Sequence, residues 1–201
     1  MQKLPIKNNI RIKLIDVIIA LLFVLLFAAL ILRVLLSVSY IKYYVIGPSM
    51  SGTIEGAKDE NTEGGDYVFA YKSHYPRRGD IAVIKTSGKT IIKRVIALEG
   101  DTVELKKGVL YLNGEETPES YILKEHNDPL DEYNSFAEIT VPKGRMFCMG
   151  DNRNVSVDSR SETYGCMPTE WTVGIVADWS MTLKGAVTSV STFFDFTIRA
   201  R

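Results

Sequence analysis

The sequence predicts a mostly β domain preceded by one transmembrane helix at the N-terminus. Residues 17–32 are all apolar, and the chain after residue 40 carries short β-branched and aromatic runs separated by Gly-, Pro- and Asn-containing turns. No segment beyond the apolar one repeats its hydrophobic residues with the 3.6-residue period of an amphipathic helix. About 160 residues remain after the N-terminal segment, which is enough for one domain with its own core.

The composition excludes several classes of protein. The 201 residues include 24 Lys and Arg and 24 Asp and Glu, so the formal net charge is zero. The basic residues are scattered among acidic ones and form no clustered basic face, which argues against nucleic acid as a partner. Cys148 and Cys166 are not spaced as metal ligands, and two free thiols or one disulfide are both open. We expect no metal and no cofactor.

The N-terminal 38 residues are predicted to anchor the protein in a membrane. Residues 1–13 carry four basic residues and no acidic one, and we assign them as a cytoplasmic tail. Residues 14–38 are assigned as the transmembrane helix, with Arg33 snorkelling toward the headgroups. About 22 apolar residues at about 1.5 Å each cover roughly 33 Å, which spans a hydrocarbon core of about 30 Å. Everything after Tyr40 then lies across the membrane.

A cleavable signal peptide is the alternative interpretation of this segment. Residues 1–13 would be its basic region, and Ser37-Val38-Ser39 would be a cleavage site of small residues. The apolar run is long for a signal peptide. A buried core helix fits less well, because the run has no polar face.

Residues 40–185 are predicted as one extracytoplasmic β domain. Its expected strands are 43–46, 67–71, 81–85, 90–97, 102–105, 109–112, 146–149 and 171–181. A hairpin at 102–112 and the acidic, weakly periodic stretch 115–138 make residues 102–140 a variable surface excursion. Residues 186–201 are predicted as a disordered tail, with contact at the membrane interface as an alternative.

Ser49 and Lys93 are the candidate catalytic pair. Ser49 follows the break Gly47-Pro48, and a serine needs a base to act as a nucleophile. Neither histidine, His74 or His126, lies near a matching serine and aspartate signature. Lys93 lies within the β-branched run 90–97, where burial would lower its pKa and leave the amine neutral. An ordinary solvent-facing strand lysine is the alternative that the residues alone leave open.

Three motifs, in order, resemble those of the bacterial type I signal peptidases in their short, Gram-positive-like form. They are Gly47-Pro48-Ser49-Met50, Ile91-Ile92-Lys93-Arg94-Val95-Ile96 and the polar loop 150–160, which reads GDNRNVSVDSR. Members of that family are membrane-anchored Ser/Lys endopeptidases that remove signal peptides from secreted preproteins. The resemblance covers roughly residues 40–180 and leaves 115–138 outside.

The resemblance implies a role for each matched residue. Ser49 is the nucleophile that forms an acyl-enzyme, and Lys93 is its general base. The hydroxyl of Ser156 would hydrogen-bond the lysine, while Asp158 and Arg160 would pair and brace the loop. A shallow pocket for the small residue before the cut would be lined by Met50, Ile92 and Gly47.

The resemblance also implies a setting and a substrate. Preproteins with an Ala-x-Ala-like site would be cut at the outer face of a bacterial cell membrane, with phospholipid and the protein-export machinery nearby. The backbone N–H of Ser49 is the first candidate oxyanion donor. The second donor is open, because some members carry a hydroxyl where this chain has Gly47.

This chain departs from the family pattern in three places. It lacks a proline after Ser49-Met50, carries Glu99 where proline is common, and has a longer connection at 161–163. These differences affect loop stiffness and pocket shape more than the acid–base groups. A membrane-tethered binding module without catalysis is the rival function. A Ser/Lys self-cleaving regulator is disfavoured by the N-terminal anchor and the lack of a DNA-binding region.

Overall fold

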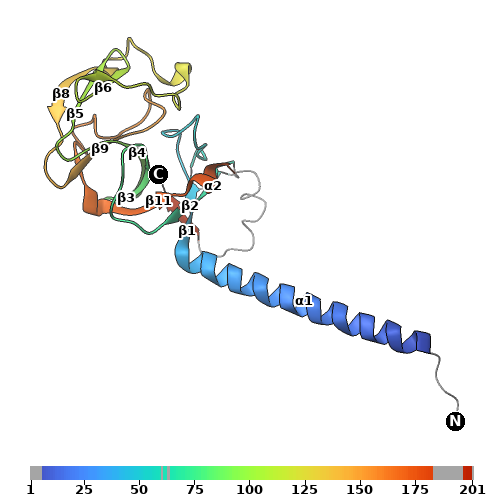
Figure 1. The fold of residues 1–201 in the computed structure, drawn as a ribbon. Coiled ribbons are helices and arrows are strands. Elements are labelled where there is room, and N and C mark those ends of the chain that lie inside the picture. The colour runs from blue at the N-terminus through green and yellow to red at the C-terminus, as the bar shows by residue number, and fades with distance from the viewer. Residues whose placement is uncertain (1–5, 60, 63, 183–196, 201) are drawn as a thin grey trace. The chain divides into compact units, whose positions relative to one another are not determined.

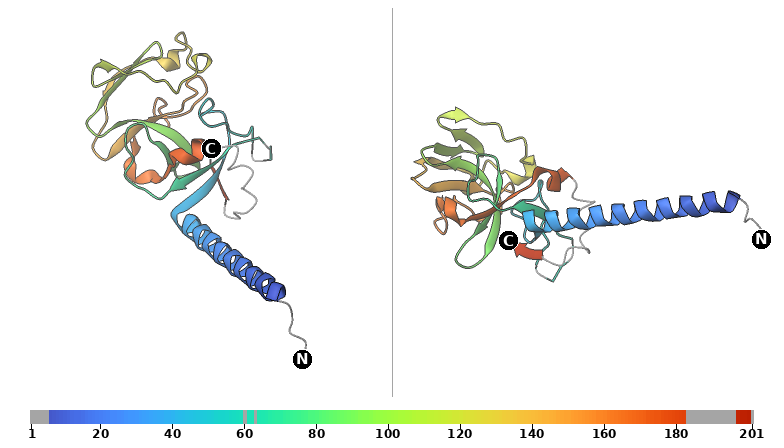
Figure 2. Two further views of the ribbon diagram at one scale, coloured as in Figure 1. Left: turned by 45° about the vertical axis from the view of Figure 1, so that its right-hand side comes forward. Right: turned by 60° about the horizontal axis from the view of Figure 1, so that its bottom comes forward.

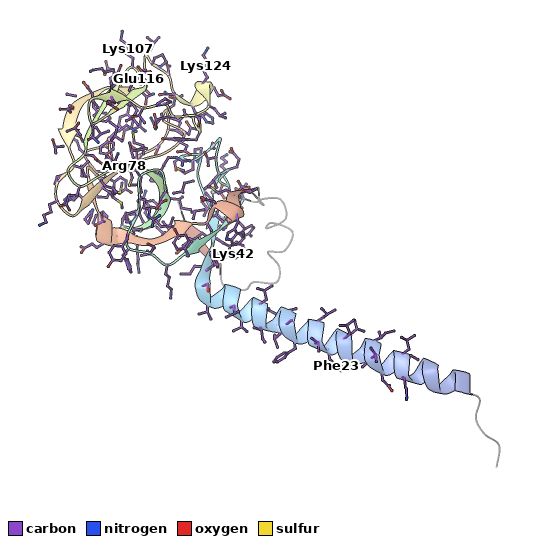
Figure 3. All side chains as sticks on the ribbon, in the orientation of Figure 1. Phe23, Lys42, Arg78, Lys107, Glu116 and Lys124 are labelled. Atoms are coloured by element: carbon purple, nitrogen blue, oxygen red, sulfur yellow. The ribbon has the colours of Figure 1, made fainter. Side chains whose placement is uncertain are left out.

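The N-terminal segment forms one long helix, α1 (Ile6–Ser39). The computed structural model describes residues 6–59, 61–62, 64–182 and 197–200, without the side chains of 6–12, 36–37 and 197–200. The helix begins eight residues before the predicted anchor and contains neither Gly nor Pro. Within it, Lys13–Leu35 is long and apolar enough to cross a membrane. Apolar side chains such as Phe23 project from it on all sides (Figure 3).

The chain from Tyr40 onward folds as a separate unit built on two sheets. The larger sheet has eight strands in the order β10-β9-β4-β3-β11-β2-β1-β12, and the smaller has four in the order β7-β6-β5-β8. Figures 1 and 2 show the smaller sheet grouped at one end of this unit, beside β9 and β4.

The bounds of the strands are as follows. The larger sheet contains β1 (Tyr40–Val45), β2 (Tyr67–Tyr71), β3 (Ile81–Lys85), β4 (Thr90–Leu98), β9 (Arg145–Met149), β10 (Met167–Pro168), β11 (Thr172–Val176) and β12 (Thr197–Ala200). The smaller sheet contains β5 (Thr102–Lys106), β6 (Val109–Leu112), β7 (Glu115–Glu116) and β8 (Phe136–Thr140).

The central strands are buried on both faces, which explains their continuous apolar sequences. In β3, Ile81 and Val83 pack into one hydrophobic cluster, and Ala82 and Ile84 pack into a second cluster. The same alternation continues along β4, which pairs antiparallel with both β3 and β9. A polar side chain in the middle of β4 is therefore removed from water by the sheet itself.

A third cluster joins the two sheets. Phe147 of β9 lies in it, together with Val103 and Leu105 of β5. Its ring contacts the ring of Phe136 at the start of β8, with the centroids 5.4 Å apart. Strand β9 leads directly into the polar loop 150–160, so this cluster also fixes the point at which that loop begins.

The mostly β fold is confirmed, and the C-terminal end of the domain requires two corrections. The predicted strand 171–181 ends at Val176, and the short helix α2 (Asp178–Thr182) follows it. The tail was expected to be disordered, but residues 197–200 form β12, which pairs parallel with β1. The rest of the predicted tail, 186–196 and 201, lies outside the described residues.

The excursion has more regular structure than its sequence indicated. Between the strands β7 and β8 it contains two single-turn 3₁₀ helices, Lys124–His126 and Glu132–Asn134. The side chain of Asp131 caps the second of these by accepting a hydrogen bond from the N–H of Tyr133. Strand β8 begins at Phe136, inside the stretch expected to be irregular.

Replacing Phe147 by Ala tests the cluster between the sheets. Phe147 is 1% exposed, and its loss leaves a cavity between β9 and the smaller sheet. We expect the free energy of unfolding to fall by about 3–5 kcal/mol. Urea unfolding of the detergent-solubilised protein measures this loss, and Val109→Ala, at a half-exposed site on β6, serves as the control. A loss below about 1 kcal/mol for Phe147→Ala would contradict the packing.

Candidate active site

Ser49 lies in a tight turn directly after β1. The chain reverses at Gly47, whose φ of +87° is unfavourable for any residue with a Cβ atom. The turn is closed by hydrogen bonds from the N–H of Ser51 to the Pro48 carbonyl and from the N–H of Ile54 to the Met50 carbonyl. These contacts hold the Ser49 hydroxyl at the surface of the domain.

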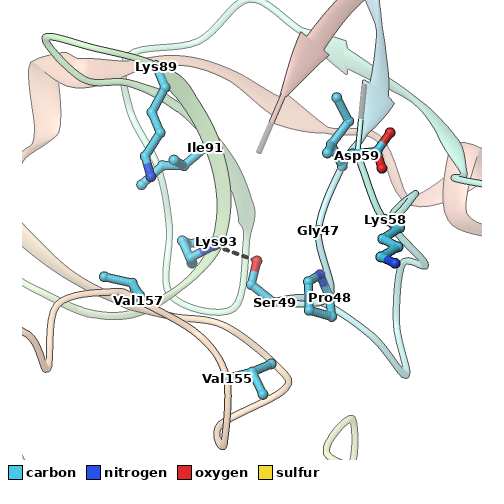
Figure 4. A pocket seen from close by; sticks show the side chains of 11 residues that line it. Gly47, Pro48, Ser49, Lys58, Asp59, Lys89, Ile91, Lys93, Val155 and Val157 are labelled. Carbon is cyan, nitrogen blue, oxygen red and sulfur yellow. Dashed lines mark hydrogen bonds between the residues drawn. The ribbon is translucent and has the colours of Figure 1, made fainter. Parts of the chain in front are cut away.

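Lys93 approaches this hydroxyl from the middle of β4. Its backbone pairs with Ala82 of β3, and the residue is 2% exposed. The amine Nζ lies 2.7 Å from Ser49 Oγ and donates a second hydrogen bond of 2.9 Å to the Ile92 carbonyl. Figure 4 shows the amine and the hydroxyl pointing toward one another across the cleft. The solvent-facing alternative for Lys93 is therefore excluded by its burial.

The environment of Lys93 favours the neutral amine. Burial lowers the pKa of Lys93 from its ordinary 10.5 to about 8. The carboxylate of Asp158 opposes this shift, and the ammonium group of Lys89 adds to it. With this pKa about a tenth of the amine is unprotonated at pH 7 and about half near pH 8, and the unprotonated form is the one that can accept a proton.

A cleft of about 330 Å³ surrounds the pair. Its apolar lining residues are Ile46, Pro48, Ile91, Val155 and Val157, and its charged ones are Lys58, Asp59 and Lys89. The cleft is open to solvent, and its walls come from the turn after β1, the loop with Lys58 and Asp59, β4 with the turn before it, and the polar loop (Figure 4).

Two of the three predicted pocket residues do not line this cleft. Met50 and Ile92 are each 1% exposed and belong to the hydrophobic cluster behind the site. Ile92 points to the opposite face of β4 from Lys93, as strand alternation requires. Gly47 does line the cleft. The pocket side chains instead include Ile91, which precedes Lys93 by two residues on the same face of β4.

Asp158 and Arg160 form the expected pair, and it is buried. Nε and Nη2 of Arg160 donate to the two carboxylate oxygens of Asp158, each at 2.9 Å, and the exposed fractions of the two side chains are 1% and 0%. The N–H of Gly150 also donates to Asp158. Burial alone would raise the pKa of Asp158, but Arg160 and the Gly150 N–H outweigh it, so the pKa is lowered.

Ser156 lies at the site but differs from its expected role. Its hydroxyl is buried without a hydrogen bond of standard geometry, and no hydrogen bond between Ser156 and Lys93 occurs among the described residues. A Cβ atom on Gly150 would lie 2.3 Å from both Ser156 Oγ and the Ser49 carbonyl oxygen. Glycine at 150 is therefore required for the polar loop to pack this closely against the Ser49 turn.

Two further buried ion pairs hold the polar loop, and the motif-based reasoning did not assign them. Arg94 of β4 donates to both carboxylate oxygens of Asp151, at 2.9 and 2.6 Å. Arg153 pairs with Glu119 of the excursion. An arginine in the β-branched run of β4 was a usable signal for the first pair. The second joins segments 34 residues apart, and nothing local in the sequence indicated it.

The histidines and cysteines lie outside the dyad. His74 Nδ1 lies 2.6 Å from the Thr172 carbonyl oxygen, and His126 lies in the excursion. Cys148 and Cys166 are both free and pack into different hydrophobic clusters. Among the described residues no three His, Cys, Asp or Glu side chains are grouped as metal ligands.

A serine hydroxyl within hydrogen-bond distance of a buried lysine amine, in a groove on a β domain, is a site typical of serine hydrolases that use lysine as their base. Residues 14–179 of this chain match the sequence pattern of a protein family described as "Signal peptidase, peptidase S26". The chain therefore belongs to the signal peptidase family, which confirms the resemblance inferred from the three motifs.

Two Bacillus relatives agree with this assignment in sequence. Signal peptidase I of Bacillus licheniformis is 36% identical over 129 residues, which cover 59% of this chain and 65% of that protein. Signal peptidase I U of Bacillus subtilis (strain 168) is 37% identical over 149 residues, covering 71% and 76%. A crystal structure of a signal peptidase I from Enterococcus faecalis V583 is 30% identical and covers 51% of this chain and 97% of that chain, with a TM-score of 0.44.

Replacing Lys93 by Met tests the energetic consequence of burying the amine. Between pH 8 and 10.5 the unfolded chain holds this proton and the folded chain has lost it, so stability rises with pH across this window. Below pH 8 the buried amine of the folded protein is protonated, and keeping this charge buried lowers the free energy of unfolding by about 3 kcal/mol. We expect Lys93→Met to raise the free energy of unfolding at pH 7 by about 1–3 kcal/mol, less near pH 11. Chemical unfolding at both pH values measures this, and destabilisation at pH 7 would refute it.

Proposed function

We propose that this protein is a membrane-bound serine endopeptidase that removes N-terminal signal peptides from secreted preproteins, cutting after small residues of Ala-x-Ala-like sites. The observation that carries the proposal is the 2.7 Å contact between Ser49 Oγ and the amine of the buried Lys93. Family membership supports the peptidase class and the type of substrate.

The first chemical step uses the contact between Ser49 and Lys93. The neutral Lys93 amine takes the proton of the Ser49 hydroxyl, and Ser49 Oγ attacks the scissile carbonyl carbon. The tetrahedral intermediate collapses, the peptide bond breaks, and Lys93 returns the proton to the leaving amine. Lys93 then takes a proton from water, whose oxygen attacks the ester, and the proton returns to Ser49 Oγ as the acyl group leaves.

The oxyanion of the tetrahedral intermediate requires donors that are already in place. The N–H of Ser49 makes no hydrogen bond within the described part of the chain, which supports its role as one donor. The N–H groups of Ser51, Thr53 and Ile54 are occupied by the turn. Gly47 carries no side chain that could donate, so this proposal assigns one donor only.

The setting follows from the helix α1. We propose that residues 1–13 lie in the cytoplasm, that 14–38 cross the bilayer, and that the β domain works at the extracytoplasmic face of a bacterial cell membrane. Signal peptides emerge at the same face after export, so tethering raises the local concentration of enzyme and substrate. Phospholipid and the export machinery are accordingly the expected neighbours.

Cleavage of a synthetic preprotein with an Ala-x-Ala site tests the dyad. We expect Ser49→Ala and Lys93→Met each to reduce kcat by at least about 10³-fold, because nucleophile and base act as a unit. The assay uses the detergent-solubilised full chain, and Ser51→Ala, two residues from the nucleophile, serves as the matched control. Residual cleavage by Lys93→Met near the wild-type rate would move the base elsewhere, and no cleavage by folded wild type would favour a binding module.

The pH dependence of the rate tests the protonation state of the base. The pKa of Lys93 is lowered to about 8, and the active form is the neutral amine. We therefore expect kcat/KM to rise about tenfold per pH unit below the pKa and to level off above it. Measurements from pH 6 to 10 on one peptide substrate determine the apparent pKa. A flat profile, or one that falls from pH 7 to 9, would reject lysine as the base.

A further inference from the structure

The excursion contributes a buried carboxylate, that of Glu119, to the packing of the polar loop. Glu119 follows β7, and its side chain is 7% exposed although the surrounding segment is at the surface. Both of its carboxylate oxygens accept hydrogen bonds from the terminal nitrogens of Arg153, with Nη1 at 2.9 Å. The side chain of Arg153 is fully buried. A buried guanidinium without Glu119 would carry an uncompensated charge.

Arg153 connects Glu119 to the part of the polar loop that binds the Ser49 turn. Its Nε donates to the Gly150 carbonyl at 3.0 Å, and its own N–H donates to the His126 carbonyl at 2.8 Å. The next residue back along the loop, Asn152, donates its N–H to the Ser49 carbonyl at 3.1 Å. The position of the Ser49 backbone therefore depends on a loop whose buried arginine is held by the excursion.

Tyr121 makes a second connection, to the strand that carries the base. Its hydroxyl donates to Glu119, and its ring lies 3.8 Å from the guanidinium of Arg94. Arg94 follows Lys93 on β4 and binds Asp151, which also accepts a 2.6 Å hydrogen bond from Thr53 in the Ser49 turn. Tyr121 thus covers an ion pair that links β4, the polar loop and the Ser49 turn.

We propose that Glu119 and Tyr121 are positioning residues, which set the distance between Ser49 and Lys93 by holding Arg153 and Arg94 in place. The proposal rests on the proposed peptidase function and deepens it. It assigns to the excursion, which none of the three motifs includes, a part in building the active site. Effects of this kind are large in rate, because a misplacement of about 1 Å can cost a hundredfold.

Four variants of the full-length, detergent-solubilised protein test the proposal. Glu119→Gln removes the charge but keeps the shape, and Tyr121→Phe removes only the hydroxyl. The matched controls in the same excursion and its hairpin are Glu116→Gln, at an exposed residue of β7 that is labelled in Figure 3, and Tyr111→Phe on β6. We expect kcat to fall about 10–100-fold for Glu119→Gln and about 3–10-fold for Tyr121→Phe, with KM within about threefold. Both controls should stay within about twofold of wild type.

Replacing both members of the Glu119–Arg153 ion pair by Met distinguishes an effect on catalysis from an effect on stability alone. Glu119→Met alone leaves Arg153 buried and unpaired, whereas Glu119→Met with Arg153→Met replaces the ion pair by apolar side chains. We expect the double variant to recover the unfolding midpoint lost in Glu119→Met while kcat stays low, because no group then donates to the Gly150 carbonyl. Recovery of both stability and kcat would reduce the pair to a structural brace and overturn the proposal.

Hydrogen–deuterium exchange provides a readout that does not require activity. Glu119→Gln should increase amide exchange in residues 49–54 and 150–160 and leave the strands β5 and β6 unchanged. If wild type cuts no preprotein, the proposed function fails, and this exchange pattern still decides whether the excursion positions the Ser49 turn. A folded Glu119→Gln variant with wild-type kcat and wild-type exchange would refute the proposal.

Discussion

The burial of the Lys93 amine is the constraint on which the rest of this site depends. A lysine in water is almost fully protonated at neutral pH and cannot accept the proton of a serine. Lys93 lies in the middle of β4, between β3 and β9, and the packing around its side chain leaves the residue only 2% exposed. The β sheet therefore both positions the amine 2.7 Å from the Ser49 hydroxyl and lowers its pKa.

Buried carboxylates near the Lys93 amine raise its pKa and so oppose the lowering that burial causes. Asp158 and Asp151 both raise the pKa of Lys93, and each is bound to a guanidinium, Arg160 and Arg94 respectively. The pairing offsets part of each carboxylate's field, because opposite charges a few Å apart act on a third group as a dipole. The ion pairs of the polar loop thus have two roles: they hold its shape, and they leave Lys93 without a strong counter-ion.

The polar loop is defined by its contacts with three different parts of the chain. It binds β4 through Arg94, the Ser49 turn through the N–H of Asn152, and the excursion through Glu119. Its two exposed valines, Val155 and Val157, alternate with the buried Ser156 and line the cleft. A loop held this firmly on its inner side presents its outer side chains to a peptide with little loss of conformational freedom.

The sequence by itself predicted the apolar anchor segment and the mostly β character, and its three motifs singled out Ser49 and Lys93 through their resemblance to a known family. The first two features depend on local composition, an unbroken apolar run and β-branched runs between turn residues, whereas the residues around Lys93 alone left a solvent-facing lysine open. Only the tertiary structure decided which side chains face the cleft. The side chains of Met50 and Ile92 lie in the core, and Ile91 and two valines line the cleft instead. Glu119, in a segment that the sequence predicted to be a surface excursion, pairs with the buried Arg153. Such contacts depend on strand register and on buried charges finding partners far apart in the chain, and no local pattern encodes either one.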